Sequence, residues 1–383
     1  IEIVTKSTPV KYEMRSYQLD LAKEIHSPGL LIFKEILESN LAEMIRIAGG
    51  TEFLYPHCKT HKTKEITRVM LNLGITHHKC ATIAEAEMLA ICGAPHILIA
   101  YQLVGPNIER AIELTHRFPN SQFFTLVDCP QILSQLEAQF TAAQKSIGVF
   151  IDLETGMNRT GIEPGDSAIA LAEMAYSSET IQFQGLHWYD GHHRQGDFNE
   201  RKQLTLAAWK NFTRFRDQLT LQGIPIKQIV AAGSGSFPIL AEVHEPSLLL
   251  SPGTTTLYDA DLMEKFPELD FQPAIAILTR VISSNHRNHL TLDVGHKSCA
   301  ADQPAGKRLW FPHVPDAVEV QQTEEHCVIK TEQADDYPVG SHLIAIPRHA
   351  CPTVAVHEFA HVVSAGKAID QWRIAARNRM LTI

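Results

Sequence analysis

The sequence predicts an α/β protein that consists of a (β/α)8 barrel and a second, mostly antiparallel β domain. From about residue 34, short apolar runs alternate with helical segments, and eight such runs can be counted up to residue 250. Most of these runs are continuously apolar, as expected of parallel strands that are buried on both faces. After about residue 265 helical periodicity almost disappears, and strand-like segments are joined by polar turns.

The first predicted strand includes the apolar run Glu52-Phe53-Leu54, and a helix is predicted over Lys64–Met70. The longest helical segment covers residues 200–221. The eight predicted strands are 52–58, 76–80, 97–101, 122–127, 147–153, 181–189, 227–232 and 247–250. Eight strands with intervening helices favour a closed barrel, and an open doubly wound sheet is the competing architecture.

The second domain is predicted from four strands, at residues 274–282, 289–294, 325–329 and 342–346. An apolar run at 29–33 would be a ninth barrel strand, so we expect it to join the β domain instead. The expected division is therefore a barrel over 34–264 and a β domain over 265–383, to which residues 1–33 contribute.

Composition and charge exclude several classes of protein. The net charge is −9 without a polybasic run, so we expect no nucleic-acid or membrane partner. No stretch approaches the ~18 apolar residues of a membrane-spanning helix. Residues 1–6 lack the layout of a signal peptide, and the seven cysteines show no CxxC spacing. We therefore expect a cytoplasmic protein with reduced cysteines.

Residues 55–62, Tyr-Pro-His-Cys-Lys-Thr-His-Lys, follow the apolar run 52–54 and include the end of the first predicted strand. Ligands of α/β proteins bind at the carboxyl ends of strands, so Lys59 is expected to point into a binding site. A desolvated lysine has a lowered pKa, and its neutral amine can form a Schiff base with a carbonyl group. A surface loop with solvated lysines is the alternative.

Two short turns rich in glycine and hydroxyl groups follow the seventh and eighth predicted strands. They are Gly233-Ser234-Gly235-Ser236 and Pro252-Gly253-Thr254-Thr255. Glycine lets a backbone approach a phosphate closely, and backbone N–H and hydroxyl groups donate hydrogen bonds to it. Because both turns lie at the same end of consecutive strands, they predict a phosphate site.

His349 and Cys351 are candidates for metal ligands. Their spacing of two places both side chains on one face of an extended segment. A thiolate with an imidazole favours zinc, whereas a carboxylate in place of the thiolate would favour manganese. A buried cysteine beside a capping histidine is the alternative. Residues 357–361 have the form HExxH, but their β-rich surroundings do not suit the helix that a zinc protease requires, so we interpret them as a chance match.

Several motifs in sequence order resemble those of the D-threonine aldolase and D-serine dehydratase family, which consists of pyridoxal-phosphate enzymes with an alanine-racemase-like fold. Residues 56–62 resemble PHxKTHK, and residues 156–161 match GMNRxG. The other similar segments are 80–87 (CAxxxEAE), 97–106 (ILIANQVVGP), 293–297 (DAGxK), 325–326 (DEHG) and 349–353 (HxCPT).

The resemblance implies specific roles for individual residues. Lys59 would carry the cofactor, with Tyr189 and His192 as further catalytic residues. The implied cofactor-binding residues are Lys59, His57, Arg159, Ser234, Gly235, Ser236, Gly253 and Thr254. Arg159 would lie near the pyridine nitrogen, and an ion pair with Asp152 or Glu154 is its alternative role. His349 and Cys351 would hold a divalent metal, with zinc favoured and manganese possible, and the resemblance also implies a homodimer.

The first functional hypothesis is a lyase that acts on small D-β-hydroxy-α-amino acids. Retro-aldol cleavage would give glycine and an aldehyde, whereas dehydration would remove the Cα proton through Lys59 and expel hydroxide. Residues 97–106 and 156–161 favour the aldolase, which we place first, whereas Cys351 and Gly191-His192 favour the dehydratase. An amino-acid racemase would need a second base and no metal. A non-catalytic cofactor carrier would be a single barrel.

Overall fold

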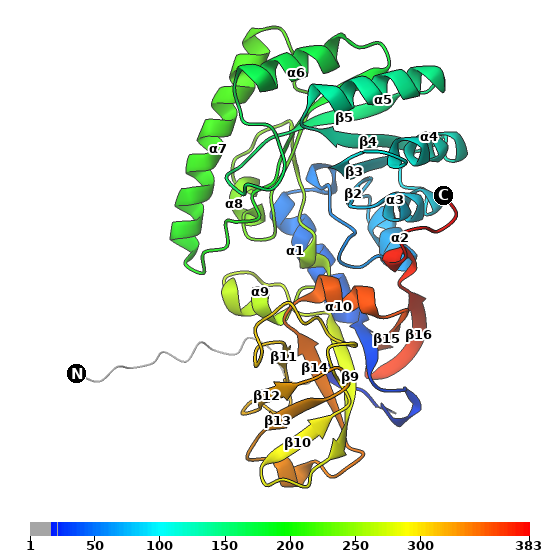
Figure 1. The fold of residues 1–383 in the computed structure, drawn as a ribbon. Coiled ribbons are helices and arrows are strands. Elements are labelled where there is room, and N and C mark those ends of the chain that lie inside the picture. Colours follow the sequence, from blue (N-terminus) through cyan, green and yellow to red (C-terminus); the bar gives the residue numbers. More distant parts are fainter. Residues whose placement is uncertain (1–16, 21) are drawn as a thin grey trace, which may run out of the picture.

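The computed structural model describes residues 17–20 and 22–383. Their strands form a parallel sheet curled into a barrel and a second, mostly antiparallel sheet below it in Figure 1. The predicted fold class is confirmed. The predicted domain boundaries at residues 264 and 265 stay a prediction.

Seven parallel strands form the barrel sheet in sequential order. They are β2 (His77–Cys80), β3 (His96–Gln102), β4 (Gln122–Val127), β5 (Ile147–Asp152), β6 (Ile181–Trp188), β7 (Gln228–Ala231) and β8 (Leu248–Leu250). Residues 54–58 close the barrel between β8 and β2. The Tyr55 N–H donates to the Leu250 carbonyl at 2.7 Å, and the Cys58 N–H donates to the Lys79 carbonyl at 2.8 Å. This closure excludes the open doubly wound sheet.

The predicted strand at residues 52–58 is wrong in its first part. Thr51–Phe53 form a short 3-10 helix, and the chain becomes continuously buried only from Leu54. Gly49 ends the preceding helix with a φ of +80°, a conformation that glycine adopts without steric cost. Residues 51–53 therefore form the turn that leads from α1 to the barrel, and the extended segment begins after them.

Helices cover the outside of the barrel in Figure 1. They are α1 (Lys34–Ala48), α2 (Lys64–Asn72), α3 (Ile83–Ile91), α4 (Asn107–Arg117), α5 (Pro130–Ala142), α6 (Asp166–Ser177), α7 (Phe198–Leu221) and α8 (Phe237–Ala241). The short helix α9 (Ala260–Lys265) lies below the barrel in Figure 1, near the second sheet. The large hydrophobic core lies between helices α1–α8 and the sheet. Packing of the apolar helix faces thereby holds the strands, and the loops that follow them, in place.

The barrel interior is filled by large side chains that alternate along the strands. Tyr55, Phe124 and Phe150 belong to one buried cluster. Gly148 leaves room for the Phe124 ring, because a Cβ atom there would lie 2.1 Å from Phe124 Cδ1. Two polar residues line the cavity at the barrel mouth: Asp152, two residues after Phe150 on β5, and Lys79 on β2. The packed layer therefore supports a polar mouth at the carboxyl ends of the strands.

The second sheet has the strand order β12-β13-β10-β9-β1-β15-β16, and β14 pairs with β9 and β11. Its strands are β1 (Gly29–Phe33), β9 (Ile275–Ser283), β10 (His289–Leu292), β11 (Leu309–Trp310), β12 (Val318–Gln322), β13 (Cys327–Lys330), β14 (His342–Pro347), β15 (Phe359–Ser364) and β16 (Lys367–Arg373). The apolar run 29–33 lies here, antiparallel to β9 and parallel to β15.

A short helix, α10 (Ala350–Val356), lies between the barrel and the second sheet in Figure 1. The sequence-based prediction of an extended segment here is wrong beyond His349. Asp259 accepts a hydrogen bond from the Ala350 N–H at 3.0 Å, and Pro352 is tolerated in the first helical turn. Residues 357–361 span the end of α10 and the start of β15, so the HExxH segment is not helical, as predicted.

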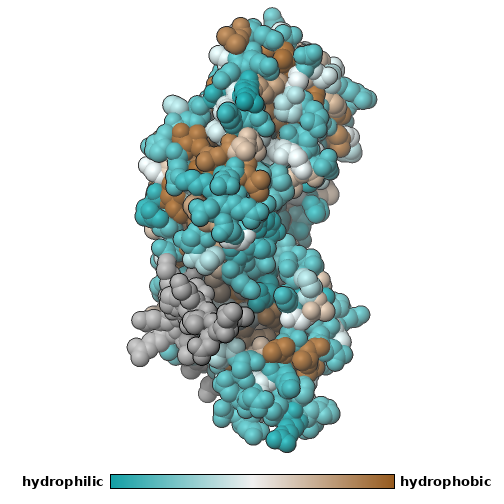
Figure 2. All heavy atoms as spheres, turned by 90° about the vertical axis from the view of Figure 1, so that its left-hand side faces the viewer, coloured by the Kyte–Doolittle hydropathy of each residue, from teal (hydrophilic) through white to brown (hydrophobic). Residues whose placement is uncertain are grey.

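Figure 2 shows the face that carries α7 as mainly hydrophilic, with separate hydrophobic areas on its upper and lower parts. Within residues 17–20 and 22–383, no helix is long and apolar enough to span a bilayer.

Candidate active site

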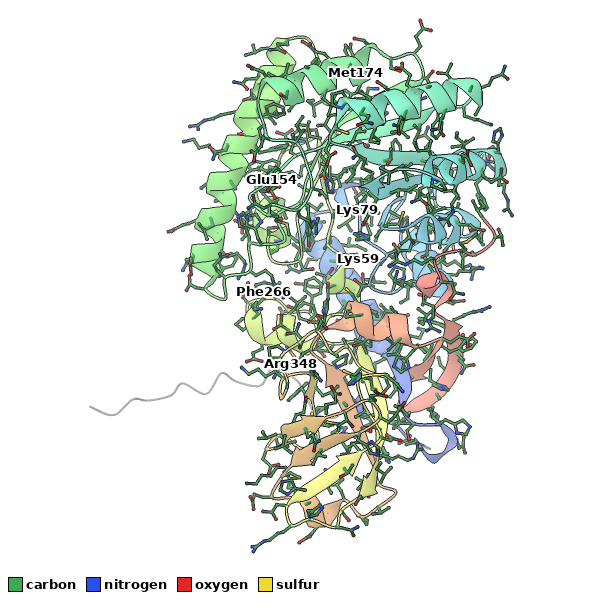
Figure 3. The ribbon with its side chains drawn as sticks, viewed as in Figure 1. Lys59, Lys79, Glu154, Met174, Phe266 and Arg348 are labelled. Atoms are coloured by element: carbon green, nitrogen blue, oxygen red, sulfur yellow. The ribbon has the colours of Figure 1, made fainter. Side chains whose placement is uncertain are left out.

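Lys59 lies at the barrel mouth, one residue after the segment that closes the barrel. The preceding Cys58 is held by β2, and its carbonyl accepts from the His61 and Lys62 N–H groups at 3.1 and 2.9 Å. This tight turn directs the chain into α2. Figure 3 shows Lys59 and Lys79 at the end of the barrel that faces the second sheet, with Arg348 across the junction. The lysine therefore lies at a strand end, as predicted.

Lys59 and Tyr189 line two cavities. The smaller one, of about 150 Å³, is also lined by Gly233, Ser234, Gly235, Thr254, His349 and Cys351. The larger one, of about 510 Å³, extends along the barrel mouth and is also lined by His57, Lys79, Asp152, Arg159 and His187. The Lys59 Nζ lies 6.0 Å from the centre of the Tyr189 ring. An amine, a glycine-rich turn and two candidate metal ligands thus meet in one small space.

A carboxylate behind the turn at 233–236 holds it in shape. Asp190 Oδ1 accepts from the Gly233 N–H at 3.0 Å and from Ser236 Oγ at 2.6 Å. Arg201 Nε donates to the Gly235 carbonyl at 3.0 Å. A Cβ atom at position 235 would lie 2.8 Å from the His193 carbonyl, so this position requires glycine. The turn is therefore preorganised, with Ser234 and Gly235 at the cavity surface.

The structure tests whether these residues suit pyridoxal phosphate. That cofactor needs an amine for its aldehyde, donors for its phosphate and a flat surface for its ring. Lys59, the Ser234–Gly235 backbone with Thr254, and the Tyr189 ring supply these three features around the smaller cavity. A Cβ atom at Gly253 would lie 3.2 Å from His57 Cβ, which keeps this second turn close to Lys59. The residues fit the cofactor.

His349 and Cys351 face the same cavity although Cys351 lies in the first turn of α10. Burial opposes protonation of His349, but hydrogen bonds with Cys351 and Asp302 raise its pKa to about 9. Burial also opposes ionisation of Cys351, and the contacts with His349, Lys59 and Thr60 nevertheless lower the pKa of its thiol. Thr60 Oγ1 lies 3.2 Å from Cys351 Sγ.

Asp302 contacts His349 Nδ1, which leaves Nε2 of that ring for another partner. A carboxylate on the outer nitrogen of a ligating histidine is the usual support of a metal site. An imidazole and a readily ionised thiol suit zinc. The pair therefore fits a divalent metal, and Asp302 is a supporting residue that the sequence analysis missed.

A second cluster of potential ligand atoms in the described part of the chain consists of His57, Cys58 and Glu85. Glu85 is already engaged there, because it contacts the Lys62 ammonium and accepts from the Ala81 N–H at 2.6 Å. These bonds neutralise the buried carboxylate and fix the turn after Cys58. The cluster has a structural role in holding Lys59.

The larger cavity carries several charged groups. Lys79, on β2, is 2% exposed. Its Nζ lies 5.7 Å from the centre of the Tyr189 ring, and Arg159 Cζ lies 4.9 Å from the same centre. His187 Nδ1 is 2.7 Å from Asp152 Oδ1, whereas the buried His187 Nε2 has no hydrogen-bond partner. Lys79 and His187 were not singled out from the sequence. Because alternate residues of a strand face opposite sides of the sheet, the strand pattern could have indicated that both face inward.

The predicted site residues divide between the two cavities. Ser234, Gly235 and Thr254 line the smaller cavity, and His57 and Arg159 line the larger one. Gly253 belongs to the second turn, beside His57. Three predicted residues, Gly253 among them, line neither cavity: Ser236 is 1% exposed behind its turn, and His192 is exposed near the 156–161 loop.

Two further observations concern the surroundings of Tyr189. His193, rather than His192, lines the smaller cavity, and its ring lies 3.2 Å from Thr205 Oγ1. Arg159 forms no ion pair with Asp152 or Glu154 within the described residues, and it lies beside the Tyr189 ring instead. Glu154 accepts the Gly156 N–H at 2.5 Å, which shapes the loop that carries Arg159.

Known proteins resemble this chain in both sequence and structure. Residues 33–259 match the family described as the alanine racemase N-terminal domain, and residues 274–363 match a putative serine dehydratase domain. The chain belongs to the alanine racemase N-terminal-domain family. The chain is 28% identical to the D-threonine aldolase of Arthrobacter sp. over 367 residues, which cover 94% of each protein. It is 26% identical to the 3-hydroxy-D-aspartate aldolase of Paracoccus denitrificans over 373 residues, 93% of each.

Solved structures of this family are similar as well. The D-threonine aldolase from Filomicrobium marinum superposes with a TM-score of 0.87 at 26% identity, over 94% of this chain and 98% of that one. The D-threo-3-hydroxyaspartate dehydratase from Delftia sp. HT23 superposes with a TM-score of 0.82 at 18% identity, over 92% and 98%. The resemblance seen in the motifs is confirmed, and so is the predicted class of enzyme, a pyridoxal-phosphate-dependent lyase.

Proposed function

We propose that the protein is a pyridoxal-phosphate- and metal-dependent lyase that cleaves the Cα–Cβ bond of D-β-hydroxy-α-amino acids. One observation carries this proposal: Lys59, the turn at Ser234–Gly235 and the His349/Cys351 pair line the same small cavity. The amine that would hold the cofactor and the two residues that would hold a metal for the β-oxygen therefore face one small space. The relatives named as aldolases of D-threonine and 3-hydroxy-D-aspartate support the substrate class.

Lys59 would bind the cofactor covalently, and Ser234, Gly235 and Thr254 would donate to its phosphate. When bound, pyridoxal phosphate withdraws electrons from the Cα atom of an amino acid, so that one bond to that carbon can break. Tyr189 provides an aromatic face beside Lys59, and Arg159 also lies beside that ring. Asp190 keeps the phosphate turn rigid, which preserves the position of the reacting carbon.

His349 and Cys351 would hold the divalent metal, with zinc favoured by the thiolate and manganese possible. A cation there would stabilise negative charge on the β-oxygen of the substrate. We further propose that His193 rather than His192 exchanges the proton of the β-hydroxyl, because it lines this cavity and Asp190 and Thr205 orient its ring. Tyr189 remains the other proposed catalytic residue.

A second candidate function is dehydration of the same substrates. It is favoured by Cys351, since zinc held by a thiolate can assist the departure of hydroxide from the β-carbon. Lys59 would then remove the Cα proton. A racemase is less well supported, because the His349/Cys351 pair has no role in that reaction.

Product analysis separates the two lyase reactions. With D-threonine, we expect the holoenzyme with zinc or manganese to form glycine and acetaldehyde in equal amounts. Dehydration would instead give a keto acid and ammonia. An aldehyde assay, a keto-acid assay and chiral amino-acid analysis of one sample measure all outcomes. Keto acid without glycine would replace the aldolase by the dehydratase, and formation of L-allothreonine alone, by inversion at Cα, would support a racemase.

We also propose a homodimer in which a second copy covers the rim of the larger cavity. Tyr101 is 63% exposed and Val104 is 48% exposed on that rim, an arrangement that suits an interface. Sedimentation velocity should give a mass of about two chains. Tyr101→Glu should shift the protein towards the monomer, whereas Tyr176→Glu, on the outer helix α6, should not. A monomeric wild type would contradict this proposal.

A further inference from the structure

Asp259 is a buried carboxylate to which the proposed reaction gives no role. It comes four residues after the turn at 252–255, and it is 2% exposed. It lines the smaller cavity together with Lys59, His349 and Cys351. In the described part of the chain its oxygens accept from backbone N–H groups and form no ion pair. A carboxylate is costly to bury without a cation, so these N–H groups are its necessary partners.

The two oxygens of Asp259 connect two segments that are far apart in the sequence. Oδ1 accepts from the Leu262 N–H at 3.0 Å, at the start of α9, and Oδ2 accepts from the Ala350 N–H at 3.0 Å, at the start of α10. Both helices lie at the junction of the barrel and the second sheet (Figure 1). Burial raises the pKa of Asp259 to about 6, whereas the hydrogen bonds from Ala350 and Leu262 act in the opposite direction.

The contact with Ala350 lies at the bend between the two candidate metal ligands. His349 is still extended, with a φ of −146° and a ψ of 104°, whereas Ala350 begins α10. The first N–H groups of a helix have no partner within the helix, and Asp259 supplies one for Ala350. The hydrogen bond therefore holds the backbone at the point that decides how the side chains of His349 and Cys351 meet.

Other contacts hold the two side chains of this pair. Thr60, which is fully buried and directly follows Lys59, has its Oγ1 atom 3.2 Å from Cys351 Sγ. Asp302, between β10 and β11, contacts His349 Nδ1. Thr60 and Asp302 thus each act on one side chain, whereas Asp259 acts on the backbone between them.

We propose that Asp259 is a positioning residue, which fixes the bend between His349 and Cys351 and thereby places the metal relative to Lys59. This inference rests on the proposed function, in which the pair holds the metal. Asp259 belongs to the barrel, close behind the turn at 252–255, so it links the metal pair to the segment that carries the cofactor-binding residue Thr254. Without its carboxylate, the start of α10 loses this anchor and the two ligand atoms are no longer held at one separation.

A helix cap with a purely structural role would behave differently. Loss of such a cap lowers the free energy of unfolding, but it leaves the site unchanged in the molecules that stay folded. A positioning residue acts on the folded protein itself. Its loss lowers the affinity for the metal, and it lowers kcat even when the metal is saturating.

Zinc titration of the holoenzyme against a chromogenic chelator tests the proposal. We expect Asp259→Ala to raise the Kd for zinc by about tenfold or more, the effect usual for residues that support metal ligands. The affinity for pyridoxal phosphate should stay within about twofold of the wild type, because Lys59 and the turn at 233–236 are unchanged. At saturating zinc, kcat should still be about tenfold lower. Asp259→Asn, whose amide oxygen can accept from the Ala350 N–H, should lie between Asp259→Ala and the wild type.

A second helix cap provides the matched control. Asp197 Oδ1 accepts from the Glu200 N–H at 2.8 Å at the start of α7, and Asp197 is exposed and lines neither cavity. Asp197→Ala should therefore lower the unfolding temperature without changing the Kd for zinc. Circular dichroism spectra and thermal melts show that each variant is measured in its folded state. If Asp259→Ala does not fold, Asp259→Asn is titrated in its place.

The contradictory results are distinct. A folded Asp259→Ala protein with the zinc affinity and the zinc-saturated kcat of the wild type would overturn the positioning role and leave the lyase proposal intact. An equal loss of zinc affinity in Asp197→Ala would overturn it as well. A wild-type protein that binds pyridoxal phosphate but neither zinc nor manganese would overturn the proposed metal site and this inference with it.

Discussion

Replacement of Lys59 by alanine should abolish covalent binding of pyridoxal phosphate and reduce turnover by about a thousandfold or more. Both effects have one cause, because the same amine would bind the cofactor and later move a proton at the substrate. The change removes no large apolar contact, since Lys59 is half-buried at the cavity surface. The absorbance of the cofactor above 400 nm, a far-ultraviolet circular dichroism spectrum and a rate assay measure the outcome.

Two controls sharpen this prediction. Lys59→Arg keeps the positive charge but cannot form a Schiff base, so it should lose the absorbance as fully as Lys59→Ala. Lys210→Ala, at an exposed position of α7, should retain both absorbance and activity. A yellow, active Lys59→Ala protein would show that another amine carries the cofactor.

Removal of the divalent metal should abolish turnover and leave the cofactor in place. Lys59 and the phosphate turn belong to the barrel, whereas His349 and Cys351 follow β14 of the second sheet. A cation held there would stabilise charge on the β-oxygen by several kcal/mol, so its loss should slow the reaction by ~10³-fold. Dialysis against a chelator followed by absorbance, metal analysis and rate measurement checks this, and zinc or manganese should restore the rate.

Variants of Cys351 test the same site without a chelator. Cys351→Ala should lose the metal and the activity but keep the absorbance of the cofactor, whereas Cys351→Asp should retain activity with a preference shifted towards manganese. Cys92→Ala, at the end of α3 on the outside of the barrel, is the matched control and should behave as the wild type. Full turnover of a metal-free sample would reject the metal and favour the racemase.

The barrel could be predicted because apolar runs and helices alternate over more than two hundred residues, and long periodic patterns are the strongest signal in a sequence. The closing segment was harder to delimit. Its burial starts only at Leu54, and it pairs with its neighbours through isolated bridges rather than a continuous ladder. Hydrogen bonds to β8 and β2, which are distant in sequence, decide its structure.

His349 and Cys351 lie close together, as expected from the sequence, although the local geometry differs from the expected one. The alternation argument assumed an extended segment, but Asp259 caps a short helix that starts directly after His349. His349 and Cys351 still meet because the chain bends between them. This capping contact joins residues about ninety positions apart in the sequence, and no local pattern contains it.

Lys79 and His193 could not be assigned from the sequence for a different reason. Lys79 is one inward-facing residue of a short strand. That it lies at the barrel mouth is seen only when β2 is placed beside the segment before Lys59 and near Tyr189. His193 follows His192 directly, and the turn at Asp190 decides which of the two rings enters the cavity. In both cases the missing information is the relative position of separate strands.

Chemical trapping of the cofactor tests the central claim most directly. Borohydride reduction of the yellow holoenzyme fixes pyridoxal phosphate on the lysine that holds it, and mass spectrometry of the peptides identifies that residue. Lys79 provides a demanding comparison, because it lines the same cavity as Lys59. The label should be found on the peptide that contains Lys59. A label on Lys79 or another lysine, or no label, would contradict the assignment of the active site.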